Sequence, residues 1–342
     1  MHRLTVGIVS LLLAAAVPAS AQLASDNTRI SGHAFGDYYW IGANHDGSLE
    51  GLNGFWFRRI YLTYDRDAGD AFAMRLRLEM AHPGDFVTSS LAEPFVKDAY
   101  LKWKSGDTGL VLGISPTPTW GFVEGFWGYR SVEKTPLDLQ RLGSSRDFGV
   151  ALTGKLGETG IVTYHLMAGN GNSGRSETNE GKKVMAAIAL HPAEGFTLEL
   201  YGDWNGLPGD NDRSTAQVFA AYENGRGRAG LLLAHQTRRV DVANDVDLQT
   251  GSIFVAARVA ERVNVFARAD RMFDPNPDGG KISYIPFDPT AKSTFLLAGV
   301  DFVPSEGVHL IPNIEVVVYD ENGTGITPDT DVIPRVTFFY KF

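Results

Sequence analysis

The segment 332-VIPRVTFFYKF-342 alternates between two sets of side chains and ends on an aromatic residue. One set is almost entirely apolar and contains Val336, Phe338, Tyr340 and Phe342, whereas the other includes Arg335. Successive side chains of a β-strand point to opposite faces, so this period of two predicts a strand with one apolar face. Because chain ends are normally frayed and polar, the segment is interpreted as a structural element.

The same period of two recurs along most of the chain. In 71-AFAMRLRLEM-80, apolar side chains alternate with polar ones such as Arg75 and Arg77. Segments 57–65 and 196–204 alternate in the same way. Helical spacing fits none of these segments, so each is expected to be a strand whose two faces meet different environments.

Two kinds of connection alternate along the chain. Tight turns rich in Gly, Asp, Glu and Pro lie near Gly69, Gly106, Gly157, Gly195, Gly225, Glu261 and Gly307. Longer polar links span about 44–54, 82–94, 116–146, 170–182, 205–214, 241–248, 274–292 and 320–332. Seven short turns and eight long links would join sixteen strands.

The spacing of these connections fits a membrane-spanning barrel. A tilted transmembrane strand needs about 9–11 residues, which is near the length of the segments between connections. An open sheet edge would leave backbone groups unpaired in hydrocarbon, so such strands must close on themselves. We therefore predict an all-β fold, a closed antiparallel transmembrane β-barrel of 16 strands with short periplasmic turns and long extracellular loops. The last strand would close against 29-RISGHAFGDYYWIG-42 and turn its apolar set towards lipid.

The amino-terminal segment and the composition bound the remaining possibilities. Residues 1–21 combine Arg3, an apolar run and the small residues 19–21, a pattern typical of a secretory signal peptide. Residues 22–342 are then expected to form the barrel. The chain contains no cysteine, so disulfides do not hold it together, and its formal net charge of -9 does not suggest a nucleic-acid partner.

The closing sequence 335-RVTFFYKF-342 resembles the last strand of outer-membrane porins. In that family the barrel-assembly machinery recognises this strand, which implies an assembly signal at Phe338, Tyr340 and Phe342. Segments 127–149 and 271–287 are similar to phosphate-selective-type porins. We therefore expect the outer membrane of a Gram-negative-type bacterium, with lipid and lipopolysaccharide around a homotrimer.

The longest link, residues 116–146, is expected to narrow the channel. Its first half, 116-PTPTWGFVEGFWGYR-130, is rich in aromatic residues and glycine, which is unusual for a solvated loop tip. Loops of this length in compact proteins are usually functional. It resembles the porin loop that folds into the barrel, which implies a constriction with the charged residues Glu124, Arg130, Glu133, Lys134, Asp138 and Arg141. The alternative is an outer cap over the mouth.

Basic residues are prominent on the face assigned to the lumen. The predicted pore-lining residues are Arg59, Arg75, Arg77, Lys102, Lys104, Arg258, Arg268 and Arg335. Acidic residues elsewhere on the wall are Glu79, Glu199, Asp203, Asp270 and Glu315. Charges on neighbouring strands lie within one Debye length of about 8 Å, and low-dielectric walls focus their potentials. We expect a basic arc that faces an acidic loop and gives a mild preference for anions; the alternative is a balanced lumen.

A water-filled channel is the function that this architecture favours. Sixteen strands leave an aqueous lumen unless a domain plugs it. We predict a porin for passive diffusion of small hydrophilic solutes, with a substrate-specific anion channel of the phosphate type as the alternative. A barrel adhesin or structural protein that binds partners through its loops is a third hypothesis.

Other classes find less support. A soluble β-sandwich would have shorter strands, of about 5–6 residues. An enzyme needs a nucleophile near a base, but the histidines fall in no recognisable catalytic or metal-ligand spacing and no G-x-S-x-G occurs. The stretch 274-DPNPDGG-280 imitates the start of an EF-hand, yet its twelfth position is Ile285 instead of glutamate. We expect a rigid extracellular turn there, and no enzymatic activity, metal or cofactor.

Overall fold

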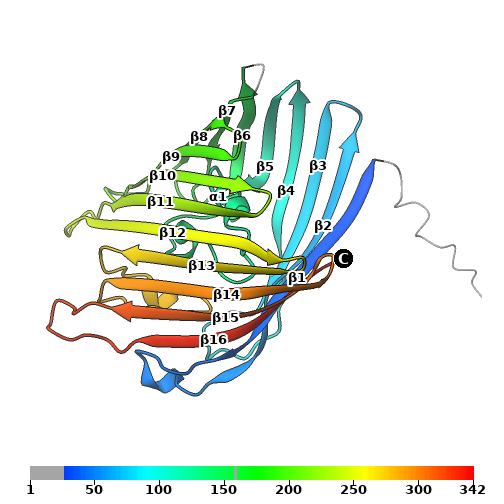
Figure 1. The fold of residues 1–342 in the computed structure, drawn as a ribbon. Helices are drawn as coiled ribbons and strands as arrows, with labels where there is room; N and C mark the ends of the chain where they lie inside the picture. The colour runs from blue at the N-terminus through cyan, green and yellow to red at the C-terminus, as the bar shows by residue number, and fades with distance from the viewer. Residues whose placement is uncertain (1–26, 158–159) are drawn as a thin grey trace, which may run out of the picture.

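The computed structural model describes residues 27–157 and 160–342. Within these residues, sixteen antiparallel strands form one closed barrel in which β1 pairs with β16 and every other strand pairs with its neighbours in sequence (Figure 1). The predicted sixteen-stranded barrel is therefore confirmed. The predicted signal peptide, residues 1–21, lies outside the described residues.

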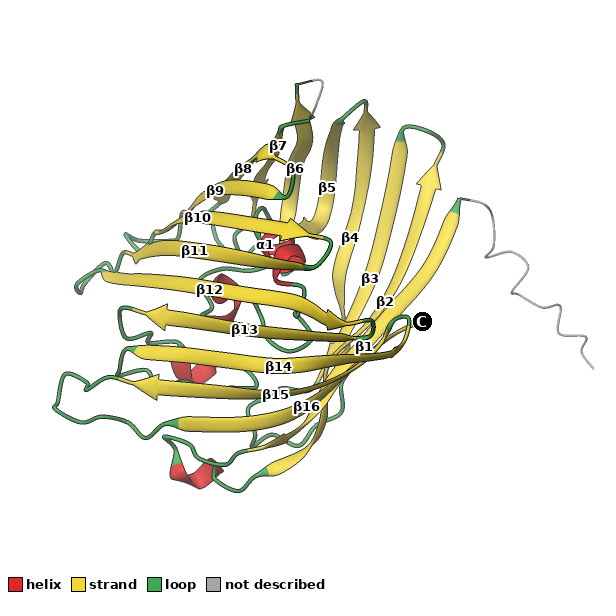
Figure 2. Ribbon diagram, in the orientation of Figure 1, coloured by secondary structure: helices red, strands yellow, loops and turns green. Residues whose placement is uncertain are grey.

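The barrel consists almost wholly of strands (Figure 2). The first eight strands are β1 (Thr28–Trp40), β2 (Asn53–Ala68), β3 (Phe72–Ala81), β4 (Glu93–Ser105), β5 (Thr108–Pro116), β6 (Arg146–Leu156), β7 (Val162–Gly169) and β8 (Lys183–Ala193). The others are β9 (Phe196–Asn205), β10 (Arg213–Asn224), β11 (Gly227–Arg238), β12 (Val246–Ala260), β13 (Val263–Met272), β14 (Ser293–Ser305), β15 (Val308–Tyr319) and β16 (Asp331–Lys341). The short helices are η2 (Gly47–Leu49), α1 (Trp120–Trp127), α2 (Pro136–Leu139) and η3 (Gly279–Lys281). No helix in the described part of the chain has the length and apolar character needed to cross a membrane.

The two ends of the barrel differ in their connections. Short turns such as the one at Gly69, which has a positive φ of 67°, lie at the end that holds Thr28 and Phe342. Eight longer connections lie at the opposite end. The longest of them joins β5 to β6 and carries α1 and α2. These ends are called the turn side and the loop side below.

The last residue takes part in closing the barrel. The backbone N–H of Gly32 in β1 donates to the carbonyl oxygen of Phe342 at 2.8 Å, and the N–H of Phe342 donates back to Gly32 at 3.0 Å. The Phe342 ring lies over Gly32, where an added Cβ atom would come within 2.3 Å of it. Phe342 and Tyr340 point outwards and are exposed, whereas Arg335 and its inward neighbours are buried. The terminal strand thus has the two faces that its sequence predicts.

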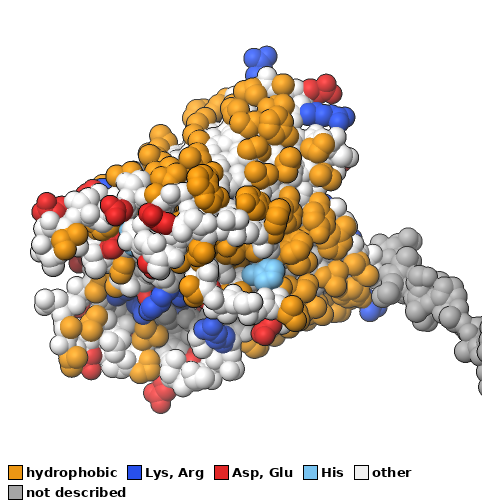
Figure 3. Space-filling view, turned by 90° about the horizontal axis from the view of Figure 1, so that it is seen from below, with side chains coloured by type: hydrophobic (Ala, Val, Ile, Leu, Met, Phe, Trp, Pro, Cys, Tyr) orange, Lys and Arg blue, Asp and Glu red, His pale blue; other side chains and the backbone are white. Residues whose placement is uncertain are grey.

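The outer wall is apolar around the barrel. Large exposed side chains such as Leu76, Leu200 and Leu233 alternate with inward residues that are buried or half-buried along their strands. Figure 3 shows hydrophobic side chains gathered over this wall. Such a band is the face that a barrel presents to lipid.

Two of the register shifts between strands add a charged side chain to the inner face. The pairing of β1 with β2 shifts between Phe35 and Gly36, so β2 has an extra residue and both Arg58 and Arg59 point inwards. A second shift, where β3 pairs with β4, turns both Lys97 and Asp98 inwards. Bulges re-aim side chains in this way because two residues then oppose one on the partner strand. The alternation alone had indicated only one inward residue at each site.

Candidate functional site

The longest connection, residues 117–145, lies inside the barrel. Helix α1 sits within the ring of strands (Figure 2), and Trp120 and Trp127 are only 2% and 1% exposed. The ring centroid of Trp127 lies 5.4 Å from that of Phe254 and 5.9 Å from that of Phe266, two residues of the inner wall. The connection therefore packs against the wall instead of covering the mouth.

One side of the interior is an apolar core. The inward side chains of the strands from β7 to β14 that join this core include Met167, Met185, Tyr201, Phe219, Leu232, Phe254, Phe266 and Phe295. The interior of an outer-membrane barrel is usually polar, so this wall departs from the rule. Burying one large apolar side chain contributes about 1.5–3 kcal/mol. The aromatic residues of the loop, which suggested its inward position, thus contribute to holding it there.

A second connection, residues 273–292, also folds inwards. Tyr284 and Ile285 are buried, and the Tyr284 hydroxyl donates to the carbonyl oxygen of His82 at 2.8 Å. Asn276 is buried as well and donates to the carbonyl oxygen of Gln140 in the first loop at 2.9 Å. Segment 274–280 does form a turn, in which the Gly279 N–H donates to the Asn276 carbonyl oxygen at 2.8 Å, and the apolar residues that follow it fold into the barrel. No group of three metal-binding side chains occurs among the described residues.

A buried charge cluster ties the first loop to the wall. Arg58 forms an ion pair with Glu133 of the loop and lies 3.6 Å from Asp37 and 3.8 Å from Glu315. Arg335 joins the cluster at 2.8 Å from Glu315. Burial by itself raises the pKa of Glu133, but Arg58 and Lys134 outweigh this effect and bring that pKa to about 2. Glu133 is therefore an ionised anchor beneath the loop, with no surface on the open lumen.

The eight predicted pore-lining cations all come from inward positions, yet most have acidic partners. The ion pairs on the wall are Arg59–Glu79, Arg75–Asp65, Arg77–Asp98, Lys104–Asp67, Arg268–Asp270 and Arg335–Glu315. Lys102 and Arg258 have no ion pair with a described residue. The structure thus differs from the expected basic arc, since six of these eight cations are paired with an acidic residue of the wall.

The other predicted loop charges are also engaged. Arg130 lies 3.5 Å from Glu124 and 3.6 Å from Asp138. Arg141 donates to a carbonyl oxygen of the second inward loop at 3.1 Å, and Lys134 does the same at 3.4 Å. Burial lowers the pKa of Lys134 to about 8 and raises that of Glu124. The loop is therefore not the acidic surface that the sequence suggested.

Two cavities inside the barrel meet at Arg146. The turn-side cavity has a volume of about 520 Å³ and lies between α1 and the wall around it. The loop-side cavity has a volume of about 290 Å³ and lies near the beginning of β8 and β10. Arg146 lines both cavities and forms an ion pair with Asp98. A third cavity, of about 390 Å³, lies on the other side of α1 and is lined by Lys102, His165 and Glu199.

Both cavities that meet at Arg146 contain more cations than anions. Seven cations line the turn-side cavity: Arg77, Lys97, Arg130, Arg146, Arg228, Arg258 and Lys341. Its two acidic residues are Glu124 and Asp301. The loop-side cavity has the cations Arg141, Arg146, Arg175, Lys183 and Arg213, against Asp147 and Asp203. Sequence reasoning missed Lys97 because of the bulge, and Arg228 and Lys341 despite their place in alternating strands.

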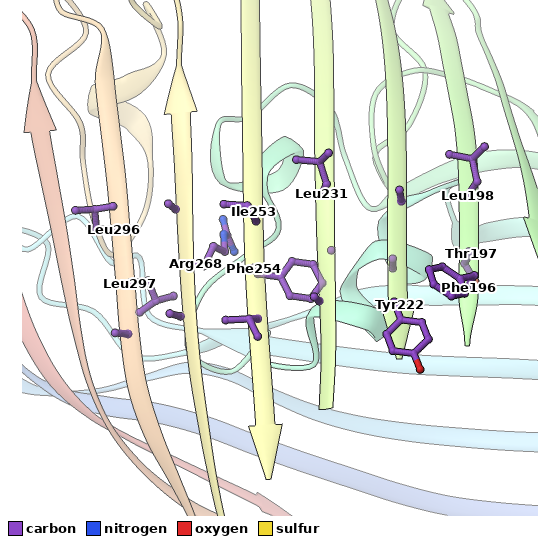
Figure 4. Close-up of a pocket in the computed structure, with 18 of the residues that line it drawn as sticks. Phe196, Thr197, Leu198, Tyr222, Leu231, Ile253, Phe254, Arg268, Leu296 and Leu297 are labelled. Atoms are coloured by element: carbon purple, nitrogen blue, oxygen red, sulfur yellow. The ribbon is translucent and has the colours of Figure 1, made fainter. Parts of the chain in front are cut away.

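A larger hollow belongs to the outer wall. It measures about 840 Å³ and lies over β9–β15, where Leu198, Leu231 and Leu296 project from the sheet (Figure 4). These leucines are outward and exposed. The hollow is therefore part of the apolar exterior and separate from the cavities around Arg146.

Comparison with known proteins identifies the fold. No protein-family model and no curated protein matches the sequence. An anion-selective porin from Comamonas acidovorans is similar with a TM-score of 0.69 and 14% identity, over 92% of this chain and 99% of that one. OmpF of Salmonella typhi, in complex with daunomycin, is similar with a TM-score of 0.65 and 12% identity, over 92% of this chain and 98% of that one. In-vitro folded OmpT of Vibrio cholerae in its trimer form is similar with a TM-score of 0.61 and 12% identity, over 92% of this chain and 99% of that one. The chain therefore has the barrel fold of these outer-membrane proteins.

Proposed function

We propose that the protein is an outer-membrane porin of a Gram-negative-type bacterium through which small hydrophilic solutes diffuse passively, with a preference for anions. The observation that carries this proposal is the meeting of two cation-rich cavities at Arg146 inside a closed barrel. The likeness in fold to an anion-selective porin supports it. The role is a passive one, without chemistry on the solute.

Selectivity would come from the few charges that face open space. Ion pairs on the wall, such as Arg75 with Asp65, act as dipoles and contribute little field at a distance. The cations around Arg146 outnumber the acidic residues, and the low-dielectric wall focuses their potential into the narrow lumen. The two inward loops limit the width that remains, so charge and size act at the same place.

Single-channel recording of the purified protein in planar bilayers tests the proposal. We expect a steady conductance and a reversal potential across a salt gradient that has the sign of anion preference. Arg146→Gln should reduce the anion-to-cation permeability ratio, because it removes a cation and leaves Asp98 with less compensation. Arg75→Gln, at a residue that lines neither cavity, is the matched control. Absence of conductance, or a cation-selective pore, would contradict the proposal.

Assembly and surroundings form the second part of the proposal. We infer a homotrimer in contact with lipid and lipopolysaccharide, inserted by the barrel-assembly machinery through a signal at Phe338, Tyr340 and Phe342. The trimer form of the Vibrio cholerae protein supports the oligomeric state by analogy in fold. Chemical cross-linking in mild detergent should give a three-subunit band, and the protein without cross-linker should migrate as a trimer before heating and as a monomer after heating. A purely monomeric species before heating would contradict the trimer.

A further inference from the structure

The turn-side cavity is lined by aromatic rings as well as charges. His33, Tyr61 and Phe339 come from three adjacent strands, and the ring centroid of His33 lies 4.6 Å from that of Tyr61 and 5.7 Å from that of Phe339. His309, on the next strand, extends the group, with its ring 5.3 Å from Phe339. We call these four side chains the ring cluster; all four line the cavity. In a water-filled lumen, such inward rings expose apolar surface that polar residues would not.

Cations border the ring cluster. The guanidinium of Arg77 lies 5.6 Å from the centre of the Tyr61 ring, and the ammonium of Lys341 lies 5.9 Å from that of Phe339. On the opposite wall, Arg228 lies 5.3 Å from the Tyr129 ring of the first loop, and Arg258 lines the same cavity. The site therefore joins flat apolar surfaces to positive charge.

The free charges of this cavity are positive. Arg228, Arg258 and Lys341 form no ion pair with a described residue, although all three line the cavity. The acidic residues are both engaged: Asp301 lies 2.8 Å from the ring nitrogen of His309 and Glu124 lies 3.5 Å from Arg130. A solute that enters would thus meet uncompensated cations and occupied carboxylates.

We propose that the turn-side cavity is a binding site for small organic anions that carry a ring, of the class of aromatic monocarboxylates. The carboxylate would bind Arg228 and Arg258, and the ring would lie against the ring cluster. This inference rests on the proposed function and adds the class of solute. An inorganic anion such as phosphate would use the cations but gain nothing from the rings, and a neutral sugar would use the rings but leave the cations without a counter-charge.

The volume of the cavity agrees with this class. About 520 Å³ exceeds what a single inorganic anion fills and falls within the range of small-molecule sites, which is about 300–1,000 Å³. Such sites combine apolar walls with a few placed polar groups. The cavity also shares Arg146 with the loop-side cavity, so an anion bound here would obstruct a current that passes through both cavities.

Block of the chloride current measures the binding. The purified protein in planar bilayers is exposed to benzoate, acetate, phosphate and glucose in turn, and the concentration that halves the current is recorded for each. Benzoate should act at a concentration about tenfold lower than acetate, because one buried ring contact of about 1.4 kcal/mol corresponds to that factor. Phosphate should resemble acetate, and glucose should be the weakest.

Two variants assign the block to this cavity. Phe339→Leu keeps an apolar side chain but removes a ring, so the tenfold ratio between acetate and benzoate should shrink several-fold. Arg258→Gln should weaken both carboxylates by a similar factor, whereas Lys102→Gln, an unpaired cation of a different cavity, should change neither.

The outcomes separate this inference from the proposed function. Equal block by benzoate and acetate in an anion-selective wild-type pore overturns the ring site and leaves the porin proposal standing. Glucose acting at lower concentration than benzoate overturns the class of solute. A pore without conductance or with cation preference overturns the proposed function itself. The ratio is measured in the wild-type protein, so the test does not depend on a variant that folds.

Discussion

Replacement of Arg58 by methionine should release the first inward loop. Arg58 and the carboxylates of Glu133, Asp37 and Glu315 are all at most 1% exposed. After the change, Asp37 and Glu315 still have Arg335, so Glu133 is the carboxylate left without its charged partner on the wall. Removal of one partner from a buried ion pair costs about 3–5 kcal/mol.

The loss of this ion pair should both release the loop from the wall and lower the free energy of unfolding. We expect the midpoint of urea unfolding in detergent to fall by an amount that corresponds to about 3–5 kcal/mol, with increased current noise as the loop leaves the wall. Tryptophan fluorescence reports the loop directly, because the indole N–H of Trp127 donates to the carbonyl oxygen of Glu133 at 2.9 Å. Arg75→Met is the control, since its partly exposed pair with Asp65 contributes about 0–1 kcal/mol.

A second change distinguishes an orphaned charge from lost packing. Glu133→Gln in the Arg58→Met background removes the unpaired carboxylate, so the double variant should recover part of the loss. If Arg58→Met has the same unfolding midpoint and the same current noise as Arg75→Met, the charge cluster does not hold the loop and the reasoning is refuted.

Three further predictions concern acid, labelling and assembly. The pKa of Glu133 is lowered from an ordinary 4.5 to about 2, so its contribution to the stability of the folded protein is complete above pH 4.5 and is lost as pH falls towards 2. The loss of stability with falling pH should therefore be less steep in Glu133→Gln than in the wild type. Equal slopes would count against the ion pair. A cysteine at Glu124, which lines the turn-side cavity, should react with a small thiol reagent and reduce the current, whereas one at buried Glu133 should stay unlabelled; the reverse order would contradict the placement of the loop. Deletion of Phe342 removes both backbone hydrogen bonds to Gly32 and should lower the yield of heat-modifiable barrel, while Lys341→Gln should not; an unchanged yield would argue against a closing role.

The sequence predicted the strands where their two faces differ in chemistry. On β3, Arg75 and Arg77 alternate with apolar residues, so inward and outward positions could be told apart. On β10 and β11 both faces are apolar: Phe219 and Leu232 point into the core, while Val218 and Leu231 point outwards. A period of two cannot distinguish a lipid face from a packed interior when neither is polar. The apolar core inside the barrel was therefore not predicted.

Local departures from the pattern account for the other misses. Arg58 lies at a bulge, which a strict alternation places on the wrong face. The second inward loop did carry a signal, because Ile282, Tyr284 and Ile285 form an apolar group that would be unusual in a solvated loop. The Pro, Asp and Gly residues at 274–280 favoured the prediction of a turn, and the apolar group that follows them was not considered. Ion pairing between strands also depends on register, which a single sequence does not fix.

These differences change which charges can select a solute. A strand-to-strand pair such as Arg77 with Asp98 has a field that falls off quickly, whereas an uncompensated cation keeps its full field across a narrow lumen. In the turn-side cavity the uncompensated cations are Arg228 on β11, Arg258 on β12 and Lys341 on β16, and of these only Arg258 was among the predicted pore-lining residues. Selectivity should therefore depend on Arg228, Arg258 and Lys341 more than on Arg75 or Arg77, even though all five side chains point into the same barrel.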